Sequence, residues 1–181
     1  MNEKLNIPNI ITIFRIILVV PITICLIQNQ YLGAVFLFSL AAISDVLDGW
    51  IARKLNMQTK IGAVLDPLAD KLLINYTFVV LTIKSYIPLI LFATILTKDI
   101  ILVVGSTIEV LSVNSISNIK IKASISGKAS TFLQVVVIAL VFFRIFKIYF
   151  NPVLFAFFVY TTMGFAIFSL LSYIKDYLKR M

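Results

Sequence analysis

Four aspartates lie close together in an otherwise apolar sequence, and they are the residues best suited to chemistry. Asp45 and Asp48 are three positions apart, and Asp66 and Asp70 are four positions apart. Positions three or four apart share one face of an α-helix, so each pair presents two carboxylates on one side. The chain has 8 Asp and Glu residues in total, so half of its acids fall between Asp45 and Asp70.

Four neighbouring carboxylates in an apolar setting require positive charge among them. Carboxylate oxygens are the ligands that hard divalent cations prefer, and Mg²⁺ or Mn²⁺ suits a set without His or thiol partners. Two such ions about 3.5–4 Å apart favour in-line displacement at phosphorus. In the alternative interpretation, these aspartates are helix caps and loop charges paired with nearby Lys and Arg, which would not require two matched spacings.

Other common catalytic sets are excluded by composition. The chain has no histidine, which excludes a Ser-His-Asp triad and a Cys/His zinc site. Its single cysteine, Cys25, forms no disulfide within the chain and is typical of a small buried apolar residue.

The elements that position the aspartates are predicted to be membrane helices. Of the 181 residues, 61% are hydrophobic and 13% are charged, too apolar for an ordinary soluble domain. A helix that crosses a bilayer needs about 20 mostly apolar residues. The sequence therefore predicts an all-α integral membrane protein, a single domain over residues 1–181, with a short N-terminal interfacial segment, residues 1–9, and six transmembrane helices near residues 10–27, 32–52, 61–83, 87–111, 124–146 and 152–174.

The distribution of basic residues predicts the orientation. Lys and Arg number 16 and give a net charge of +8. Most lie near the N-terminus, after the second and fourth spans, and in the C-terminal tail, so these segments are predicted to be cytoplasmic. Both aspartate pairs then lie near the cytoplasmic ends of adjacent antiparallel spans in an inner (cytoplasmic) membrane. No basic run has interleaved aromatics, so anionic lipids or phosphorylated substrates explain the charge better than nucleic acid.

Small residues and a proline flank the aspartates. Gly49 and Gly62 leave room for a ligand or a neighbouring backbone. Pro67 directly follows Asp66, and it is either the first residue of a helix, with Asp66 as the cap, or a proline within a helix.

The aspartates belong to a longer pattern that resembles a known family. Asp45-x-x-Asp48-Gly49-x-x-Ala52-Arg53 is followed, after eight residues, by Gly62-x-x-x-Asp66-x-x-x-Asp70. This pattern is similar, without a departure, to the signature of the CDP-alcohol phosphotransferases. The opening segment, residues 6–15, also resembles the N-terminal segment of that family, so the resemblance extends over essentially the whole chain.

The resemblance implies an enzyme, often a homodimer, that moves a phosphatidyl group from CDP-diacylglycerol to an alcohol and releases CMP. It implies that two Mg²⁺ or Mn²⁺ ions are held by Asp45, Asp48, Asp66 and Asp70, and that Asp70 is also the catalytic base. It further implies that the cytidine diphosphate site is lined by Asn9, Thr12, Gly49, Arg53 and Thr59.

The acceptor alcohol is less strongly defined by the sequence. The resemblance is greatest to the branch that uses glycerol 3-phosphate, whose phosphate would be bound by Lys98 and Lys128. That branch usually has a second Arg where this chain has Ser106. The segments around Lys98 and Lys128 also resemble cardiolipin synthases of the CDP-alcohol type, whose acceptor is phosphatidylglycerol. Inositol phosphate and serine are further acceptors used in the family.

Two other classes of protein compete with an enzyme. A transporter would place its acids through the depth of the membrane and often contains inverted repeats. A membrane scaffold without catalytic function would not need the fixed aspartate spacing. The clustering at one end and the absence of a visible repeat favour the enzyme.

Overall fold

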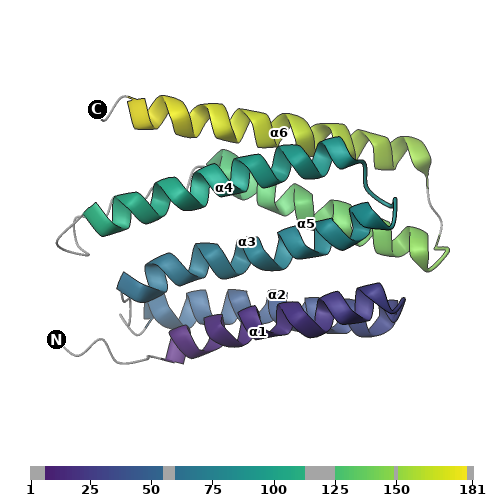
Figure 1. Cartoon of the computed structure of the whole chain (residues 1–181), viewed down its shortest axis with the longest axis horizontal. Helices are drawn as coiled ribbons and strands as arrows, with labels where there is room; N and C mark the ends of the chain where they lie inside the picture. Colours follow the sequence, from purple (N-terminus) through teal and green to yellow (C-terminus); the bar gives the residue numbers. More distant parts are fainter. Residues whose placement is uncertain (1–6, 55–59, 113–124, 149–150, 179–181) are drawn as a thin grey trace. The chain divides into compact units, whose positions relative to one another are not determined.

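The computed structural model describes residues 7–54, 60–112, 125–148 and 151–178, all but a few of which lie in α-helices. Within these segments, the side chains of residues 7–11, 45–54, 60–67, 106–107, 109–112, 125–126 and 176–178 are outside the description. The helices drawn in Figure 1 are α1 (Ile7–Ile27), α2 (Tyr31–Lys54), α3 (Lys60–Ile83), α4 (Leu89–Ser112), α5 (Ile125–Ile145) and α6 (Pro152–Leu178).

The helical segments predicted from hydropathy are confirmed as helices. Their ends differ from the predicted ones by at most four residues, and the described residues contain no strand. The predicted interfacial segment needs a correction, because residues 7–9 already belong to α1. Pro8 is compatible with the first turn of a helix, where its missing N–H is not needed. Residues 1–6 are outside the described residues.

The chain divides into two compact units. The first contains Met1–Thr77 and Ser106–Lys120, and the second contains Phe78–Gly105 and Ile121–Met181. In the first unit α1 packs against α2, and in the second α5 packs against α6. That the whole chain forms one domain stays a prediction.

Three of the described helices end in the same way. A residue with a left-handed backbone follows α1, α3 and α5, at Asn29 (φ 61°), Ser85 (φ 60°) and Lys147 (φ 55°). At each end the next backbone N–H bonds to a carbonyl five residues earlier, as in Gln30 to Cys25 at 2.8 Å. This helix-terminating motif, with two backbone hydrogen bonds, provides partners for carbonyls that the helix itself leaves without one, and it reverses the direction of the chain.

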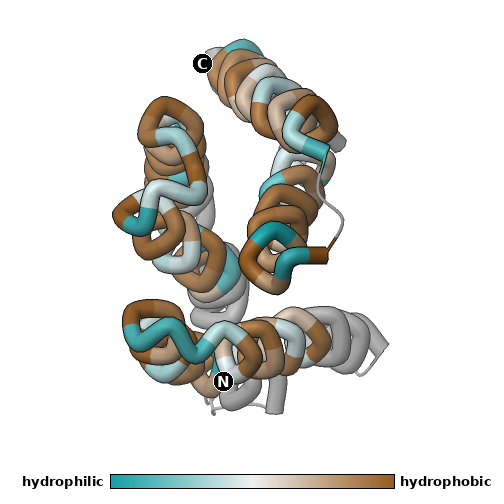
Figure 2. The backbone as a smooth tube through the Cα atoms, turned by 90° about the vertical axis from the view of Figure 1, so that its right-hand side faces the viewer, coloured by the Kyte–Doolittle hydropathy of each residue, from teal (hydrophilic) through white to brown (hydrophobic). Residues whose placement is uncertain are grey.

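The distribution of polar and apolar side chains is that of a membrane protein. All six helices expose large apolar side chains, such as Ile17, Phe36 and Phe168, and Figure 2 shows that apolar residues dominate them. Polar and charged side chains, by contrast, are among the buried ones, including Arg15, Lys98 and Gln134. Water would penalise such an exposed apolar surface, whereas lipid would not.

Two helices in the described part of the chain are long and apolar enough to cross a membrane by themselves. They are Gly127–Ile145 in α5 and Pro152–Lys175 in α6. Thr12–Ile27 and Tyr31–Ser44 are apolar but shorter. The six predicted helices are therefore confirmed as helices, two of them have the length and composition of a membrane span, and that all six cross a membrane stays a prediction.

Candidate functional site

The first unit contains the helical hairpin that carries the first aspartate pair. Residues 28–30 join α1 to α2, and Gly33 allows α2 to approach α1, since a Cβ there would lie 3.4 Å from the Cys25 sulfur. The buried face of α2 includes Ala34, Phe38 and Ala41. The helical repeat continues this face to positions 45 and 48, so the aspartate pair occupies the register of the packed face.

The second aspartate pair lies on α3. Asp70 is half-buried, one turn before the buried residues Leu73 and Ile74, and it follows the fully buried Ala69. Asp66 lies one turn earlier, so the helical repeat places both acids in the register of the buried face. Since α3 begins at Lys60, the first-residue alternative for the proline after Asp66 is wrong, and this proline lies within the helix.

The helix bounds place the two pairs at matching levels. Asp48 is six residues before the end of α2, and Asp66 is six residues after the start of α3. Asp45 is nine residues before that end, and Asp70 is ten residues after that start. With a rise of 1.5 Å per residue, the acids form two levels about 9 Å and about 14 Å from the helix ends. The chain reverses between α2 and α3 (Figure 1), so both levels are measured from the same end of the hairpin.

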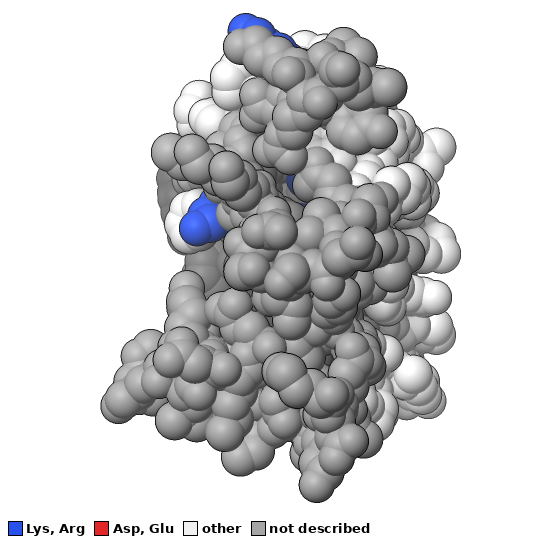
Figure 3. Space-filling view, turned by 90° about the vertical axis from the view of Figure 1, so that its left-hand side faces the viewer, with Lys and Arg blue, Asp and Glu red and all other residues white. Residues whose placement is uncertain are grey.

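The predicted nucleotide-binding residues also belong to the first unit. Thr12 is fully buried on α1, and the backbones of Asn9, Gly49 and Arg53 lie in α1 and α2. The side chains of these last three, and those of Asp45, Asp48 and Asp66, are outside the described residues, as is the whole of Thr59. On the face seen in Figure 3, the charged atoms of the described residues are those of Lys and Arg, and none belongs to Asp or Glu.

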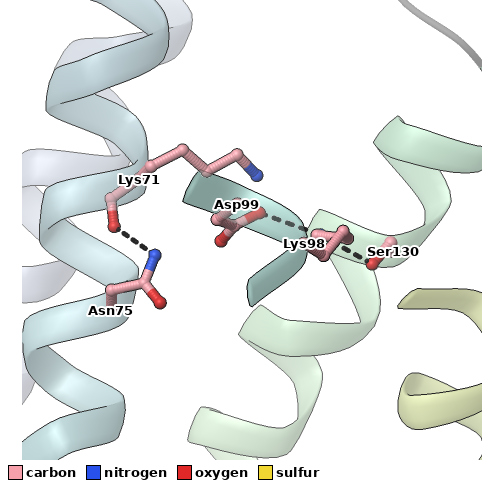
Figure 4. A network of polar contacts seen from close by, with 5 residues as sticks. All are labelled: Lys71, Asn75, Lys98, Asp99 and Ser130. Atoms are coloured by element: carbon pink, nitrogen blue, oxygen red, sulfur yellow. Dashed lines mark hydrogen bonds and ion pairs between the residues drawn. The ribbon is translucent and has the colours of Figure 1, made fainter. Parts of the chain in front are cut away.

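A buried polar network surrounds Lys98 in the second unit. The Lys98 ammonium on α4 forms an ion pair with Asp99 at 3.0 Å and donates a hydrogen bond to the Ser130 hydroxyl on α5 at 3.0 Å (Figure 4). The exposed fractions of these three side chains are 2% or less. A buried ammonium requires such partners, and the adjacent carboxylate neutralises its charge.

The sequence did not single out two buried polar residues of α5, one within this network and one next to it. Ser130 is the α5 partner of Lys98, and Gln134 follows it by one turn on the same helix face. Gln134 is fully buried, and neither atom of its amide has a hydrogen-bond partner within the described residues. Burial is a tertiary property, so spacing alone could not separate these residues from other polar residues of the helix.

The two lysines predicted to bind an acceptor phosphate have different surroundings. Lys98 is buried, whereas Lys128 is exposed. Positions 128 and 130 are about 200° apart around α5, so Lys128 is on a different helix face from the Ser130 hydroxyl that contacts Lys98. The structure brings Lys98 together with Asp99 and Ser130, and it leaves Lys128 at the surface of α5.

Comparison with known proteins assigns the family. The sequence pattern of the CDP-alcohol phosphatidyltransferases matches residues 5–170. The chain belongs to this family. The match confirms the resemblance drawn from the aspartate pattern, and it confirms an enzyme of the phosphatidyltransferase type over the transporter and scaffold alternatives.

Several proteins named as phosphatidyltransferases or as cardiolipin synthases are similar to the chain. The CDP-diacylglycerol–glycerol-3-phosphate 3-phosphatidyltransferase of Aquifex aeolicus is 38% identical over 106 residues, which cover 56% of this chain and 58% of that protein. The Rickettsia typhi enzyme of the same name is 40% identical over 134 residues, 71% of each chain. Human cardiolipin synthase (CMP-forming) is 38% identical over 99 residues, 54% of this chain and 33% of that protein.

The aspartate positions fit the divalent ion on which CDP-alcohol phosphatidyltransferases generally depend. Carboxylate oxygens are ligands for Mg²⁺ and Mn²⁺, and the two levels on α2 and α3 provide one acid from each helix. Among the side chains that the structure describes, no group of three or more His, Cys, Asp or Glu forms. Asp70 is the single member of the set of four with a described side chain, so the metal site stays a prediction.

Proposed function

We propose that the chain transfers a phosphatidyl group from CDP-diacylglycerol to glycerol 3-phosphate, giving phosphatidylglycerophosphate and CMP. The family match over residues 5–170 carries the reaction class, because this match includes every aspartate of the pattern. Relatives named for this acceptor, such as the Rickettsia typhi enzyme, support glycerol 3-phosphate.

In the proposed reaction the acceptor hydroxyl attacks the phosphorus that bears the diacylglycerol. A new P–O bond forms to the acceptor, the bond to the bridging oxygen of the diphosphate breaks, and CMP leaves with that oxygen. Two divalent ions held by Asp45, Asp48, Asp66 and Asp70 would neutralise the diphosphate and the charge that develops on the leaving group.

Asp70 is proposed as the base for this step. Its carboxylate accepts the proton of the attacking hydroxyl as the P–O bond forms. The position on α3 supports this role, since Asp70 is half-buried next to fully buried Ala69 and lies at the deeper of the two carboxylate levels. A half-buried carboxylate stays accessible to an alcohol while most of the surrounding water is excluded.

The nucleotide end of the substrate is assigned to α1 and α2. Asn9, Thr12, Gly49, Arg53 and Thr59 are proposed to bind the cytidine diphosphate. The fully buried Thr12 hydroxyl offers hydrogen bonding, and Arg53 offers a planar cation that suits phosphate oxygens. Gly49 lets the backbone approach the nucleotide closely, because it has no side chain.

Lys98 is proposed to bind the polar group of the acceptor, with Lys128 as a second cation. Ser130 and Gln134 add neutral hydrogen-bonding groups in the same part of the second unit. Because Asp99 neutralises Lys98, the network carries little net charge. A doubly charged phosphate monoester bound there would therefore need a second cation, which Lys128 or another part of the chain would provide.

Phosphatidylglycerol is the second candidate acceptor, and the Lys98–Asp99 ion pair favours it. A neutralised lysine suits a singly charged phosphate diester better than a doubly charged monoester. The similarity to human cardiolipin synthase (CMP-forming) and the serine at position 106 point in the same direction.

One assay separates these functions. The protein, purified in detergent, is incubated with CDP-diacylglycerol, Mn²⁺ or Mg²⁺, and either glycerol 3-phosphate or phosphatidylglycerol. CMP release that needs both a divalent ion and glycerol 3-phosphate is the expected result, with phosphatidylglycerophosphate as the lipid product. If phosphatidylglycerol supports CMP release and glycerol 3-phosphate does not, phosphatidylglycerol replaces glycerol 3-phosphate as the proposed acceptor. If CMP is released in the presence of neither acceptor, both proposed functions are contradicted.

The location, orientation and oligomeric state of the enzyme are further parts of the proposal. The enzyme is proposed to act in the inner membrane with its active site and both termini on the cytoplasmic side, surrounded by lipid and paired as a homodimer. The basic segments of the sequence support this orientation, because Lys and Arg favour the cytoplasmic side of a membrane.

A further inference from the structure

Arg15 is a buried cation with no role in the reaction described above. It lies in α1, and its side chain is 1% exposed. A guanidinium stays protonated in proteins, so burial leaves it charged. A charge at this depth is tolerated only where an opposite charge or several strong hydrogen bonds compensate it.

The α1–α2 hairpin shows which residues lie at the level of Arg15. The buried residues of α1 and α2, apart from Leu18, are spaced symmetrically about Gln30 in the connecting turn. Leu26 and Ala34 are each four residues from Gln30, and Ile22 and Phe38 are each eight residues from it. Gln30 lies three residues after the end of α1 and one residue before the start of α2, so the members of such a pair lie within two residues, about 3 Å along the helix axes, of the same level.

The same symmetry continues to the aspartates. Val19 and Ala41, both buried, are each eleven residues from Gln30. Arg15 and Asp45 are each fifteen residues from it, and the next buried position of α1, Thr12, pairs in the same way with Asp48. The packed face of α1 therefore brings a buried cation to the level of the first aspartate of α2.

We propose that Arg15 is the internal counter-ion of the α2 aspartates, with Asp45 as its main partner. This role rests on the proposed function, in which Asp45 and Asp48 help to hold the metal ions. The guanidinium has a planar array of donors that matches a carboxylate, so Arg15 fixes the direction of the Asp45 carboxylate and limits repulsion among the four acids before metal binds. Arg15 is thus a positioning residue.

Direct contact of Arg15 with the diphosphate of the substrate is the competing role. Arg15 and Thr12 are both buried, but Arg15 lies at the deeper carboxylate level, whereas Thr12 lies closer to the start of α1. A residue that receives a phosphate must be reached by it, and the level of Arg15 puts Thr12 and Asp48 between it and the start of the helix. The location therefore favours the counter-ion.

The other buried cation among the described side chains provides a matched comparison. Lys98 is also 1% exposed, but its partners are Asp99 and Ser130 in the second unit. None of these residues is assigned to the metal site. Loss of Lys98 therefore removes a buried charge without changing the charge balance of the aspartates.

Thermal unfolding of the detergent-solubilised protein, with a chelator or with Mn²⁺, tests whether Arg15 balances the charge of the α2 aspartates. Arg15→Met lowers the Tm in chelator by about 10 °C, because a buried ion pair loses one partner, and by less than half as much in Mn²⁺, which replaces the missing charge. Lys98→Met lowers the Tm equally in both solutions. Arg15→Lys keeps the charge, and its Tm in chelator lies between those of the wild type and of Arg15→Met.

A second set of variants measures the pairing directly and stays informative if Arg15→Met does not fold. Adding Asp45→Asn to Arg15→Met removes the uncompensated carboxylate and restores most of the Tm in chelator, and adding Asp48→Asn restores less. Because no substrate is present, this comparison is independent of turnover. A wild-type Tm that does not rise in Mn²⁺ would count against the proposed metal site, while the double variant in chelator would still report the pairing.

Two outcomes would overturn the assignment of Arg15 as a counter-ion. One is an Arg15→Met loss of Tm that is equal in chelator and in Mn²⁺, with no rescue by Asp45→Asn, which would make Arg15 a residue of general packing. The other is an unchanged Tm together with a raised KM for CDP-diacylglycerol, which would make Arg15 a substrate ligand.

Discussion

At the scale of single residues, the role of a charged side chain in this protein depends on its burial as much as on its residue type. Lys98 and Asp99 are adjacent in the sequence and both buried, and Lys98 also contacts Ser130. Asp70 is half-buried, on a face that becomes fully buried one turn later. The same residue types therefore have different roles: the Lys98–Asp99 pair is internally balanced, whereas Asp70 is accessible to a reactant.

The proposed role of Asp70 as a base leads to a kinetic prediction. Asp70→Asn keeps the size of the side chain but removes the carboxylate that accepts the proton, so kcat falls about 10²- to 10⁴-fold. The measurement is CMP release at saturating CDP-diacylglycerol, Mn²⁺ and acceptor. Asp176→Asn, a change in α6 outside the aspartate pattern, is the control and retains the wild-type kcat. A wild-type kcat in Asp70→Asn would contradict the assignment.

The four aspartates could be found from the sequence because their spacing, 45/48 and 66/70, encodes a shared helix face. The matched levels of the two pairs then required only the helix bounds. Ser130 and Arg15 could not be assigned in this way, because their significance depends on which helix packs against which and how deeply. The sequence offered Arg15 only as a cation near the N-terminus and as the last residue of the opening segment, residues 6–15.

At the scale of elements, long apolar stretches predicted the six helices well, because their length and composition leave few alternatives. The exact ends were harder. The residues at 29, 85 and 147 that terminate α1, α3 and α5 include a serine and a lysine, whose left-handed backbones no local preference for glycine would have revealed. The fit of α4 against α6 was likewise not visible in the sequence.

That fit gives a prediction about stability. Gly105 of α4 lies directly beneath the Tyr173 ring of α6, whose hydroxyl and ring carbons would clash with an added Cβ. Gly105→Ala therefore forces the ring or the helices apart and lowers the free energy of unfolding by about 1–3 kcal/mol. Gly164→Ala, on the same α6 but with open space around the added methyl group, leaves stability unchanged or raises it by up to about 1 kcal/mol.

Thermal unfolding of the two alanine variants in detergent makes this comparison, since both substitutions add one methyl group to a helix. The expected order of Tm is Gly105→Ala below the wild type and Gly164→Ala at or above it. An equal Tm for both variants would show that α4 and α6 do not pack closely at Tyr173.

At the scale of the whole molecule, the charge distribution and the turns make a prediction about topology. If α1 to α6 all cross the membrane, the turns after α1, α3 and α5 share one side, opposite the basic segments. Cys25 is the one cysteine in the chain, so Cys25→Ser provides a background for single-cysteine labelling. Cysteines at the exposed turn positions 28, 85 and 148 are expected to react with a membrane-impermeant maleimide from the outside of intact cells.

Cysteines at positions 117 and 179, in basic segments, are expected to be protected in intact cells and to react after permeabilisation. This opposite pattern is the internal control for cell integrity. The physical reason is that each crossing reverses the side on which the next connection lies, and an even number returns the C-terminus to the side of the N-terminus. Labelling of positions 28 and 85 from opposite sides would mean that one of α2 and α3 crosses the membrane and the other does not. The predicted arrangement of the two helices as a pair of antiparallel crossings would then be wrong.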